Sequence, residues 1–578
     1  MKYLLTPLLI LSTCIASCGS FLPDPIEEFA KQTPAEIVKQ MTLEEKVGQL
    51  IHVGMSGKTS AATLKQDIET YHVGGVILFE ANLGSAAEIR ALTDSAQQIA
   101  KGASKNPVPL FVSIDQEGGR VVRVKDGVDQ LPGALAVGQT EDEGMAEDVG
   151  FRTASQLAKL GIHLLLAPVV DVNNNPANPV INSRSFSGDA EVVTKMALAY
   201  ARGVQAAGAV PVLKHFPGHG NTNTDSHTAL PTVKNDLAHM ESLELVPFRA
   251  GIAAGAPAIM SAHIVFPALD PGEPATLSPK ILKDYLRVKL GFKGLTLTDA
   301  LEMKAVADRY PPPILARKAF NAGLDVLLLT STGERTKSLF ESLLAGFKSG
   351  ELSVADLDAA VTRQVDRKLR TGLFHEYGMT RPEWKSDVAE SFKARTAAAD
   401  AHAIKLTQKY PDGLNTAVSR ASISALRKVF VVAPDLKQKV KLFARSTAMI
   451  ELAKTRGIDQ SRITVTPSPV TAAAATFAGF CRIGMQCPES IAVELADFDL
   501  WRWNLLVAEV KGAGKAGRQV PVLIGLYSGN PYLNIRVPDF GAVLCSFSPT
   551  EESVKALVYR LTDVGTVRQA RLVLADEK

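Results

Sequence analysis

The chain contains 578 residues, of which 46% are hydrophobic and 21% are charged, and its formal net charge is +3. This length exceeds that of one ordinary domain, so two or three domains are expected. A charge so close to balance gives no electrostatic basis for binding nucleic acid or for a polybasic membrane patch.

The first residues of the chain form a pattern typical of an export signal. Met1-Lys2 gives a short positive start, and residues 4–15 form a mostly apolar run that is too short to span a bilayer. The small residues before Cys18 resemble a bacterial lipobox, which implies cleavage before Cys18 and lipidation of its thiol. A plain secretory signal and a buried N-terminal helix are the alternatives. We therefore expect an exported, lipid-anchored protein of the bacterial cell envelope, and no later stretch is long and apolar enough to span a membrane.

Short apolar runs alternate with longer helical patterns over the next 300 or so residues. The eight runs are residues 49–54, 75–79, 110–114, 163–167, 210–213, 258–261, 294–298 and 325–330. The helical patterns include residues 86–101, 143–159, 190–207, 237–254 and 279–290. Runs rich in Val, Ile and Leu without strict alternation are typical of buried parallel strands. The pattern predicts a (β/α)8 barrel. An open doubly wound sheet is the alternative, but no Gly-x-Gly-x-x-Gly follows a strand.

A second α/β domain is predicted after the barrel. Residues 354–409 read as helical, and a break follows at Asp412-Gly413. Strand-like runs then recur at residues 428–433, 462–466, 503–507, 520–526 and 542–547, with helical patterns at residues 436–455 and 551–561. The predicted organisation is a signal peptide (1–17), a tether (18–32), the barrel (33–390), a linker (391–415) and the second domain (416–578).

Polar side chains follow five of the eight predicted strands. They are Asp115 to Arg120 and then Arg123 after the third, Asp171 and then Asn182 to Arg184 after the fourth, Lys214 and His215 after the fifth, His263 after the sixth, and Asp299 after the seventh. Barrel enzymes place their chemistry at the C-terminal ends of the strands. These side chains therefore predict a polar pocket at one rim of the barrel.

The densest of these segments runs from Lys214 to His227. Pro217, Gly218 and Gly220 prevent the fifth strand from continuing and prevent a helix from starting. The chain must leave the strand as a loop, and that loop carries Asp225 and His227 two residues apart. An aspartate that holds a histidine is a common way to build a proton donor that works near neutral pH.

The segment from Lys214 to His227 resembles the signature of glycoside hydrolase family 3, in the branch of the bacterial β-N-acetylglucosaminidases. The resemblance implies that His227 is the acid/base, that Asp225 fixes its tautomer, and that the second domain is an α/β sandwich. Thr298-Asp299-Ala300-Leu301-Glu302-Met303 is similar to the nucleophile motif of the family, which makes Asp299 the nucleophile. Many members have a second acidic residue where Ala300 stands. The implied sugar-binding residues are Asp115, Arg123, Arg184, Lys214 and His215.

Structural alternatives exist for several of these residues. Asp299 can cap the helix after strand seven, and Asp115 can form a buried ion pair with Arg120 or Arg123. Four residues lie at the predicted rim without a clear role: Asp171, Glu117, Arg120 and His263. His219 is expected to be structural.

No metal or other cofactor is expected. His215 and His219 are four residues apart, but Pro217 and Gly218 between them argue against the helix on which that spacing would form a ligand pair. No cysteine spacing resembles a zinc site, and nothing forces Cys481 to pair with Cys487.

The resemblance implies an exo-acting, retaining β-N-acetylglucosaminidase that removes terminal β-linked GlcNAc from muropeptides or chitooligosaccharides. Its expected partner is therefore a carbohydrate with a terminal β-GlcNAc, with membrane contact only through the lipid anchor. A β-N-acetylglucosaminide phosphorylase and a non-catalytic sugar-binding lipoprotein are the alternatives. The oligomeric state is left open, with a monomer favoured.

Overall fold

In the computed structural model, the described residues are 34–54, 57, 62–175, 178–380 and 387–425, together with five strands between residues 440 and 545. The signal peptide, the tether and Cys18 lie outside the described residues, as do Cys481 and Cys487.

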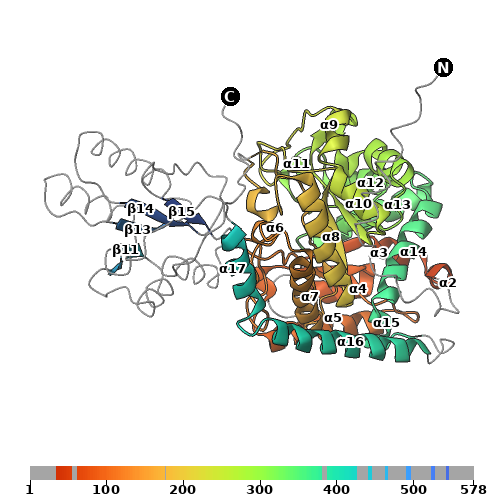
Figure 1. Cartoon of the computed structure of the whole chain (residues 1–578). Helices are drawn as coiled ribbons and strands as arrows, with labels where there is room; N and C mark the ends of the chain where they lie inside the picture. The colour runs from red at the N-terminus through yellow and green to blue at the C-terminus, as the bar shows by residue number, and fades with distance from the viewer. Residues whose placement is uncertain are drawn as a thin grey trace, which may run out of the picture.

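Eight parallel strands form a closed barrel, which the helices cover in the view of Figure 1. They are β1 (Ile51–Val53), β2 (Gly75–Leu78), β3 (Phe111–Ile114), β4 (Leu164–Leu165), β5 (Val210–Phe216), β6 (Ala258–Ser261), β9 (Leu295–Leu297) and β10 (Leu327–Leu328). Their order is β10-β1-β2-β3-β4-β5-β6-β9, and a parallel bridge between Leu297 and Val326 joins the two ends. The predicted (β/α)8 barrel is confirmed, and the open-sheet alternative is excluded.

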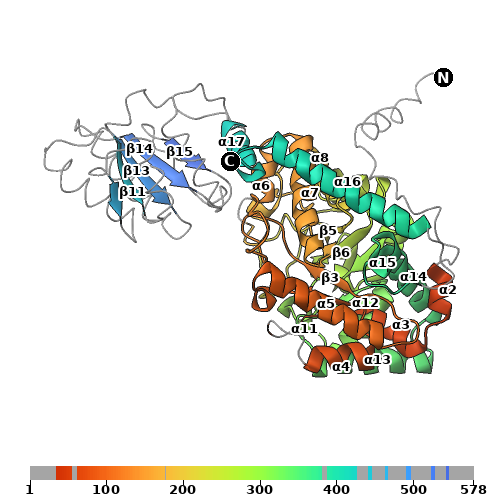
Figure 2. The ribbon, with the colours of Figure 1, turned by 90° about the horizontal axis from the view of Figure 1, so that it is seen from below.

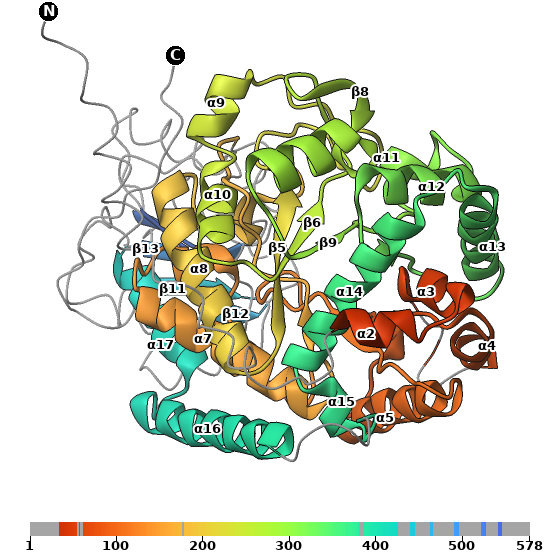
Figure 3. The ribbon, with the colours of Figure 1, turned by 90° about the vertical axis from the view of Figure 1, so that its right-hand side faces the viewer.

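Burial on both faces explains why the strands read as continuous apolar runs. Every residue of the eight strands is buried, because one face of each strand fills the barrel and the other meets the helices. Figure 3 shows the helices arranged around the strands.

The helices of the outer layer alternate with the strands along the chain, except that α2 and α3 precede β1. Its helices are α2 (Pro34–Lys39), α3 (Leu43–Gln49), α4 (Ala62–Tyr71), α5 (Ala86–Gly102), α6 (Ala134–Gly138), α7 (Glu143–Lys159), α8 (Ala190–Ala206), α9 (Leu237–Ser242), α10 (Val246–Ala253), α11 (Lys304–Ala307), α12 (Pro312–Ala322), α13 (Glu334–Ser349), α14 (Val354–Arg370) and α15 (Leu373–Glu376). A capping box of Thr42 and Glu45 begins α3, as its sequence predicts. Thr33, the predicted cap of α2, lies outside the described residues.

Shorter elements occupy the connections. They are the 3-10 turns η1 (Glu80–Asn82), η2 (Asn182–Arg184) and η3 (Ala275–Leu277), the π-helix η4 (Lys280–Lys289), and a small antiparallel pair of β7 (Val265–Phe266) and β8 (Asp270–Pro274).

Two barrel elements differ from the sequence-based prediction. The single helix predicted for residues 237–254 is wrong, because the structure has α9 and α10 with a break at Leu243. Pro247 in the first turn of α10 lacks an N–H and cannot continue an earlier helix. Strand β5 continues to Phe216 rather than ending at Leu213, so Lys214 and His215 are strand residues with fixed backbone positions.

After the barrel, α16 (Asp387–Lys409) and α17 (Leu414–Ala425) continue the chain. Figures 1 and 2 show α16 as one long helix on the outside of the helical layer. It packs on α7, where the rings of Phe151 and His402 lie 4.2 Å apart. Most of the predicted linker is therefore helical, while the domain boundaries stay a prediction.

A five-stranded parallel sheet is formed by the later part of the chain. Its strands are β11 (Val440–Ala444), β12 (Ile463–Val465), β13 (Ser490–Leu495), β14 (Val522–Tyr527) and β15 (Ala542–Cys545), in the order β12-β11-β13-β14-β15. The helix predicted for residues 436–455 is wrong where β11 lies, and β13 was not predicted. The predicted strands at 428–433 and 503–507 lie outside the described residues.

Within the described parts of the chain, none of the helices combines the length and the apolar character that crossing a bilayer requires.

Candidate active site

A cavity of about 510 Å³ lies at the C-terminal ends of the barrel strands. Seven of the predicted site residues line it: Asp115, Arg123, Arg184, Lys214, His215, His227 and Asp299. Lys214 and His215 lie on strand β5, and the others lie on the segments that follow β3, β4, β5 and β9. The barrel thus brings together side chains that are far apart in the sequence. Asp225, the remaining predicted residue, meets the cavity through His227.

Asp299 follows β9 and is half-buried. Its Oδ1 accepts a hydrogen bond of 2.8 Å from the backbone N–H of Ala300. Burial alone would raise the pKa of Asp299, but His263, His215 and this N–H outweigh it and hold the pKa below its ordinary value. The carboxylate is therefore ionised at neutral pH, as a nucleophile must be. It does not cap the next helix, because α11 begins at Lys304 with Met303 at its N-cap.

Asp225 and His227 form a pair on the loop after β5. The His227 Nδ1 atom lies 2.7 Å from Asp225 Oδ1, which also accepts the backbone N–H of His227 at 2.8 Å. Partial burial would raise the pKa of Asp225, but the hydrogen bonds and charge of His227 lower it. When Nδ1–H donates to the carboxylate, Nε2 is the ring atom left for proton transfer. The two side chains are 39% and 62% exposed, so the pair faces solvent.

A network of four charged side chains lies at another wall of the cavity, where Asp115, Arg184 and Lys214 line it and the buried Glu117 joins them from behind. Glu117 accepts hydrogen bonds from Arg184 Nε at 2.9 Å and Nη2 at 2.8 Å. Lys214 Nζ lies 2.7 Å from Glu117 Oε1 and 2.7 Å from Asp115 Oδ1. Burial would raise the pKa of Glu117, but these two cations hold it well below its usual range. Asp115 is thus held by Lys214, and the alternative ion pairs with Arg120 and Arg123 are wrong.

The role of Glu117 could not be read from its position in the sequence. It stands 67 residues from Arg184, and only the closed barrel brings the two together. Arg120 also lacked a predicted role. It donates to Asn182 Oδ1 at 2.8 Å and so connects the loop after β3 to the loop after β4.

Arg123 lines the cavity and has one unsatisfied hydrogen-bond donor. Among the described residues, its Nε is a buried atom with no hydrogen-bond partner. A buried donor without a partner costs free energy that a bound ligand can recover. This fits the sugar-binding role that the resemblance implies for Arg123.

Asp171 lies buried beneath the cavity and organises two histidines. Its Oδ2 lies 2.7 Å from His215 Nδ1, and its Oδ1 accepts the backbone N–H groups of His215 and His219. The ring of His219 contacts two hydroxyl groups, those of Thr222 and Ser226. His263 lies behind Asp299, where its ring contacts Thr276 and the Ala300 carbonyl. These contacts give Asp171 and His263 positioning roles that the sequence did not indicate.

A family model described as the glycosyl hydrolase family 3 N terminal domain matches residues 42–366, which is more than half of the 578 residues. The chain belongs to glycosyl hydrolase family 3. The matched region contains every candidate residue from Asp115 to Asp299.

Individual proteins resemble this family 3 chain to different extents. Beta-hexosaminidase A of Pseudoalteromonas piscicida is 40% identical over 332 residues, which cover 54% of this chain and 55% of that protein. The chain thus spans about half the length of this relative. Beta-hexosaminidase LpqI of Mycobacterium tuberculosis is 34% identical over 342 residues, which cover 58% of this chain and 85% of that protein.

A solved structure extends the similarity beyond the family 3 barrel. The glycoside hydrolase family 3 beta-N-acetylglucosaminidase from Paenibacillus sp. str. FPU-7 aligns with a TM-score of 0.72 at 30% identity. The alignment covers 91% of this chain and 98% of that one.

The histidines of this family 3 site are held by hydrogen bonds to neighbouring side chains. His215 and His219 lie edge to face with ring centroids 5.5 Å apart, and each ring has its own hydrogen-bond partners. Within the described ranges, no group of three or more His, Cys, Asp or Glu residues is placed to hold a metal ion.

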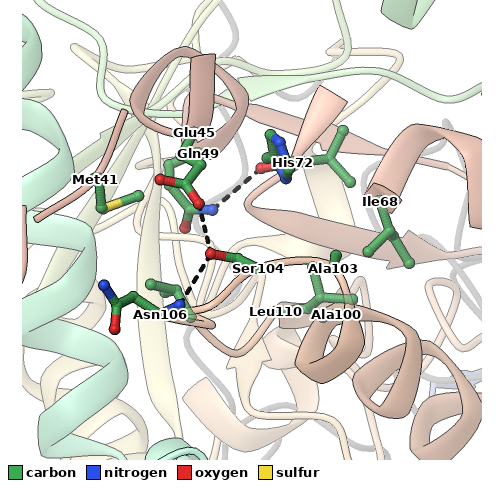
Figure 4. A pocket seen from close by; sticks show the side chains of 12 residues that line it. Met41, Glu45, Gln49, Ile68, His72, Ala100, Ala103, Ser104, Asn106 and Leu110 are labelled. Carbon is green, nitrogen blue, oxygen red and sulfur yellow. Dashed lines mark hydrogen bonds between the residues drawn. The ribbon is translucent and has the colours of Figure 1, made fainter. Parts of the chain in front are cut away.

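A second, much smaller hollow lies at the opposite end of the family 3 barrel (Figure 4). It has a volume of about 30 Å³ and is lined by residues that precede β1, β2 and β3, among them Gln49, His72 and Leu110. Its polar groups are hydrogen-bonded to one another; for example, Ser104 Oγ donates to Glu45 Oε1 at 2.5 Å. The N-terminal face of such a barrel serves stability, and this hollow holds no candidate catalytic group.

Proposed function

We propose that the chain is an exo-acting, retaining β-N-acetylglucosaminidase that removes terminal β-linked GlcNAc from muropeptides or chitooligosaccharides. The observation that carries the proposal is that Asp299 and His227 line the same cavity. The nucleophile and the proton donor of a retaining glycosidase must flank one glycosidic bond. The names of the relatives, two beta-hexosaminidases and a beta-N-acetylglucosaminidase, support the choice of sugar.

The first step transfers the sugar to the protein. The Asp299 carboxylate attacks the anomeric carbon, the bond from that carbon to the leaving oxygen breaks, and His227 gives its Nε2 proton to that oxygen. Asp225 stabilises the imidazolium that exists before the transfer and fixes the tautomer that remains after it.

The second step releases the sugar with its configuration retained. A water molecule attacks the anomeric carbon, its proton passes to the now neutral His227, and the ester bond to Asp299 breaks. Asp115, Lys214 and His215 hold the sugar hydroxyls through both steps, and the Arg123 guanidinium donates to the ligand. Arg184 contributes by fixing Glu117 and, through it, Lys214.

The test compares p-nitrophenyl β-N-acetylglucosaminide with p-nitrophenyl β-glucoside. We expect hydrolysis of the first and little of the second, and loss of activity in the folded Asp299→Ala variant. Wild-type activity in that variant would remove Asp299 from the mechanism. Product analysis in phosphate buffer separates hydrolysis from phosphorolysis, because only the latter yields GlcNAc-1-phosphate.

We also propose that the protein is exported and anchored through a lipid on Cys18, on the basis of the N-terminal sequence alone. Metabolic labelling with a radioactive fatty acid should label the wild type and not a Cys18→Ala variant. Equal labelling of the two proteins would rule this attachment site out.

A further inference from the structure

The loop that carries Asp225 and His227 is held firmly at its base, which we define as Asn221 and Asn235. Asn221 Nδ2 donates to Asn235 Oδ1 at 2.9 Å and so joins the two ends of the loop. Glu244, which is fully buried, accepts from Asn235 at 2.5 Å and from Asn174 at 3.0 Å. The two residues of the base are therefore hydrogen-bonded to each other, and Glu244 connects the base to the loop after β4.

The tip of the loop is held far less firmly. Between residues 223 and 230 every side chain is exposed or half-buried except Ser226, which is 2% exposed. The hydrogen bonds of Asp225, His227, Thr228 and Ala229 in the described structure stay within the tip, where all of them meet at Asp225.

Two residues join the tip to the rest of the barrel: Asn223, whose Oδ1 accepts from Asn175 Nδ2 at 2.7 Å on the loop after β4, and Ser226, which is the buried one. Its Oγ lies 3.2 Å from Nε2 of His219, whose Nδ1 lies 2.9 Å from Thr222 Oγ1. His219 is 2% exposed, and its backbone N–H donates to Asp171 at 2.7 Å. Burial, together with the charge of His215, lowers the pKa of His219 to about 4. At neutral pH the ring is thus neutral, with one donor and one acceptor for its two hydroxyl partners.

We propose that the contact between His219 and Ser226 is a latch that positions His227 for proton transfer. This inference rests on the proposed function, in which His227 is the acid/base. Proton transfer requires hydrogen-bond reach between the donor and the leaving oxygen. Ser226 is directly bonded along the chain to His227, so fixing its side chain fixes where the imidazole stands. His219 and Ser226 act as positioning residues and take no part in the bond changes.

The test uses the dependence of rate on the leaving group. A misplaced proton donor slows substrates with basic leaving groups and barely affects substrates whose leaving group departs without protonation. We therefore expect Ser226→Ala to lower kcat/KM for β-linked di-N-acetylchitobiose by about 10- to 100-fold. The loss for 2,4-dinitrophenyl β-N-acetylglucosaminide should be several-fold smaller. A merely destabilised protein would lose both activities in parallel.

Three further variants sharpen the result. Ser226→Thr keeps the hydroxyl group and should recover most of the activity on the disaccharide. His219→Phe removes the same contact from the other side and should give the same leaving-group pattern, even if Ser226→Ala proves too unstable to assay. Ser342→Ala removes a buried hydroxyl from α13, far from the cavity, and should leave kcat/KM for both substrates unchanged.

His227→Ala separates a failure of the latch from a failure of the proposed function. If His227→Ala shows the leaving-group dependence and both latch variants do not, the latch is overturned while the acid/base role stands. If His227→Ala itself loses activity on both substrates equally, the acid/base role is overturned and the latch with it.

Discussion

Asp171 and His215 form a buried pair in which Asp171 Oδ2 lies 2.7 Å from His215 Nδ1, and the carboxylate is fully buried. The same carboxylate accepts the backbone N–H of His219. One aspartate thus orients a predicted sugar-binding residue and holds the start of the loop that carries the proposed acid/base pair.

Asp171→Asn should lower kcat/KM by about 10- to 100-fold, because an amide nitrogen next to His215 Nδ1–H turns the ring or changes its tautomer. Activity assays together with a melting curve check this. Asp142→Asn is the matched control, since Asp142 is the N-cap of α7 and asparagine caps equally well. Equal activity in the two variants would contradict the role of Asp171.

Glu117→Gln should destabilise the fold by about 3–5 kcal/mol, because it leaves Arg184 and Lys214 buried without their shared anion. Chemical denaturation measures the free energy of unfolding. Glu191→Gln is the control, because it breaks an exposed ion pair with Lys195 on α8. Its expected effect on the free energy of unfolding is below about 0.5 kcal/mol. A similarly small change for Glu117→Gln would mean that the network does not stabilise the barrel.

Gly220→Ala should displace the loop after β5. A Cβ atom at position 220 would lie 1.7 Å from the Val172 carbonyl oxygen, which is backbone and cannot move aside. We expect a large loss of activity and a lower melting temperature. Gly102→Ala meets no atom within 4 Å at the end of α5, so its effect on activity should be negligible. An active, stable Gly220→Ala variant would show that this close approach is dispensable.

Glu376 should make stability depend on acid pH. Burial would raise its pKa, but His163 at 2.8 Å and Arg90 at 3.2 Å lower it to about 2. Its contribution of about 3 kcal/mol is fully present above the unfolded pKa of about 4.5 and is lost as the pH falls toward 2.

The stability difference between wild type and Glu376→Gln should therefore be largest near pH 7 and shrink between about pH 5.5 and pH 3. Urea denaturation across this range measures it. A difference that stays constant with pH would show that the ionised carboxylate is not what His163 and Arg90 stabilise.

The barrel could be predicted from the sequence because its signals are local. Each strand is a continuous apolar run, and polar residues follow at the strand ends, where the cavity lies. Lys214 to His227 is also a short segment, so its loop, its aspartate and its histidine are visible together in the sequence.

The supporting residues could not be predicted, because their partners are distant in the sequence. Glu117 meets Lys214 and Asp171 meets His215 only after the barrel closes. In the second sheet, β11 lies within residues 436–455, whose sequence has a helical pattern. Its pairing with β12 and β13 outweighs that local preference.

The candidate residues from Asp115 to Asp299 all belong to the barrel. In the proposed mechanism, no residue of the later sheet therefore takes part in breaking the glycosidic bond. The M tuberculosis LpqI structure aligns over 97% of its own chain but 59% of this one, so a relative can consist almost entirely of the part that it shares with this chain.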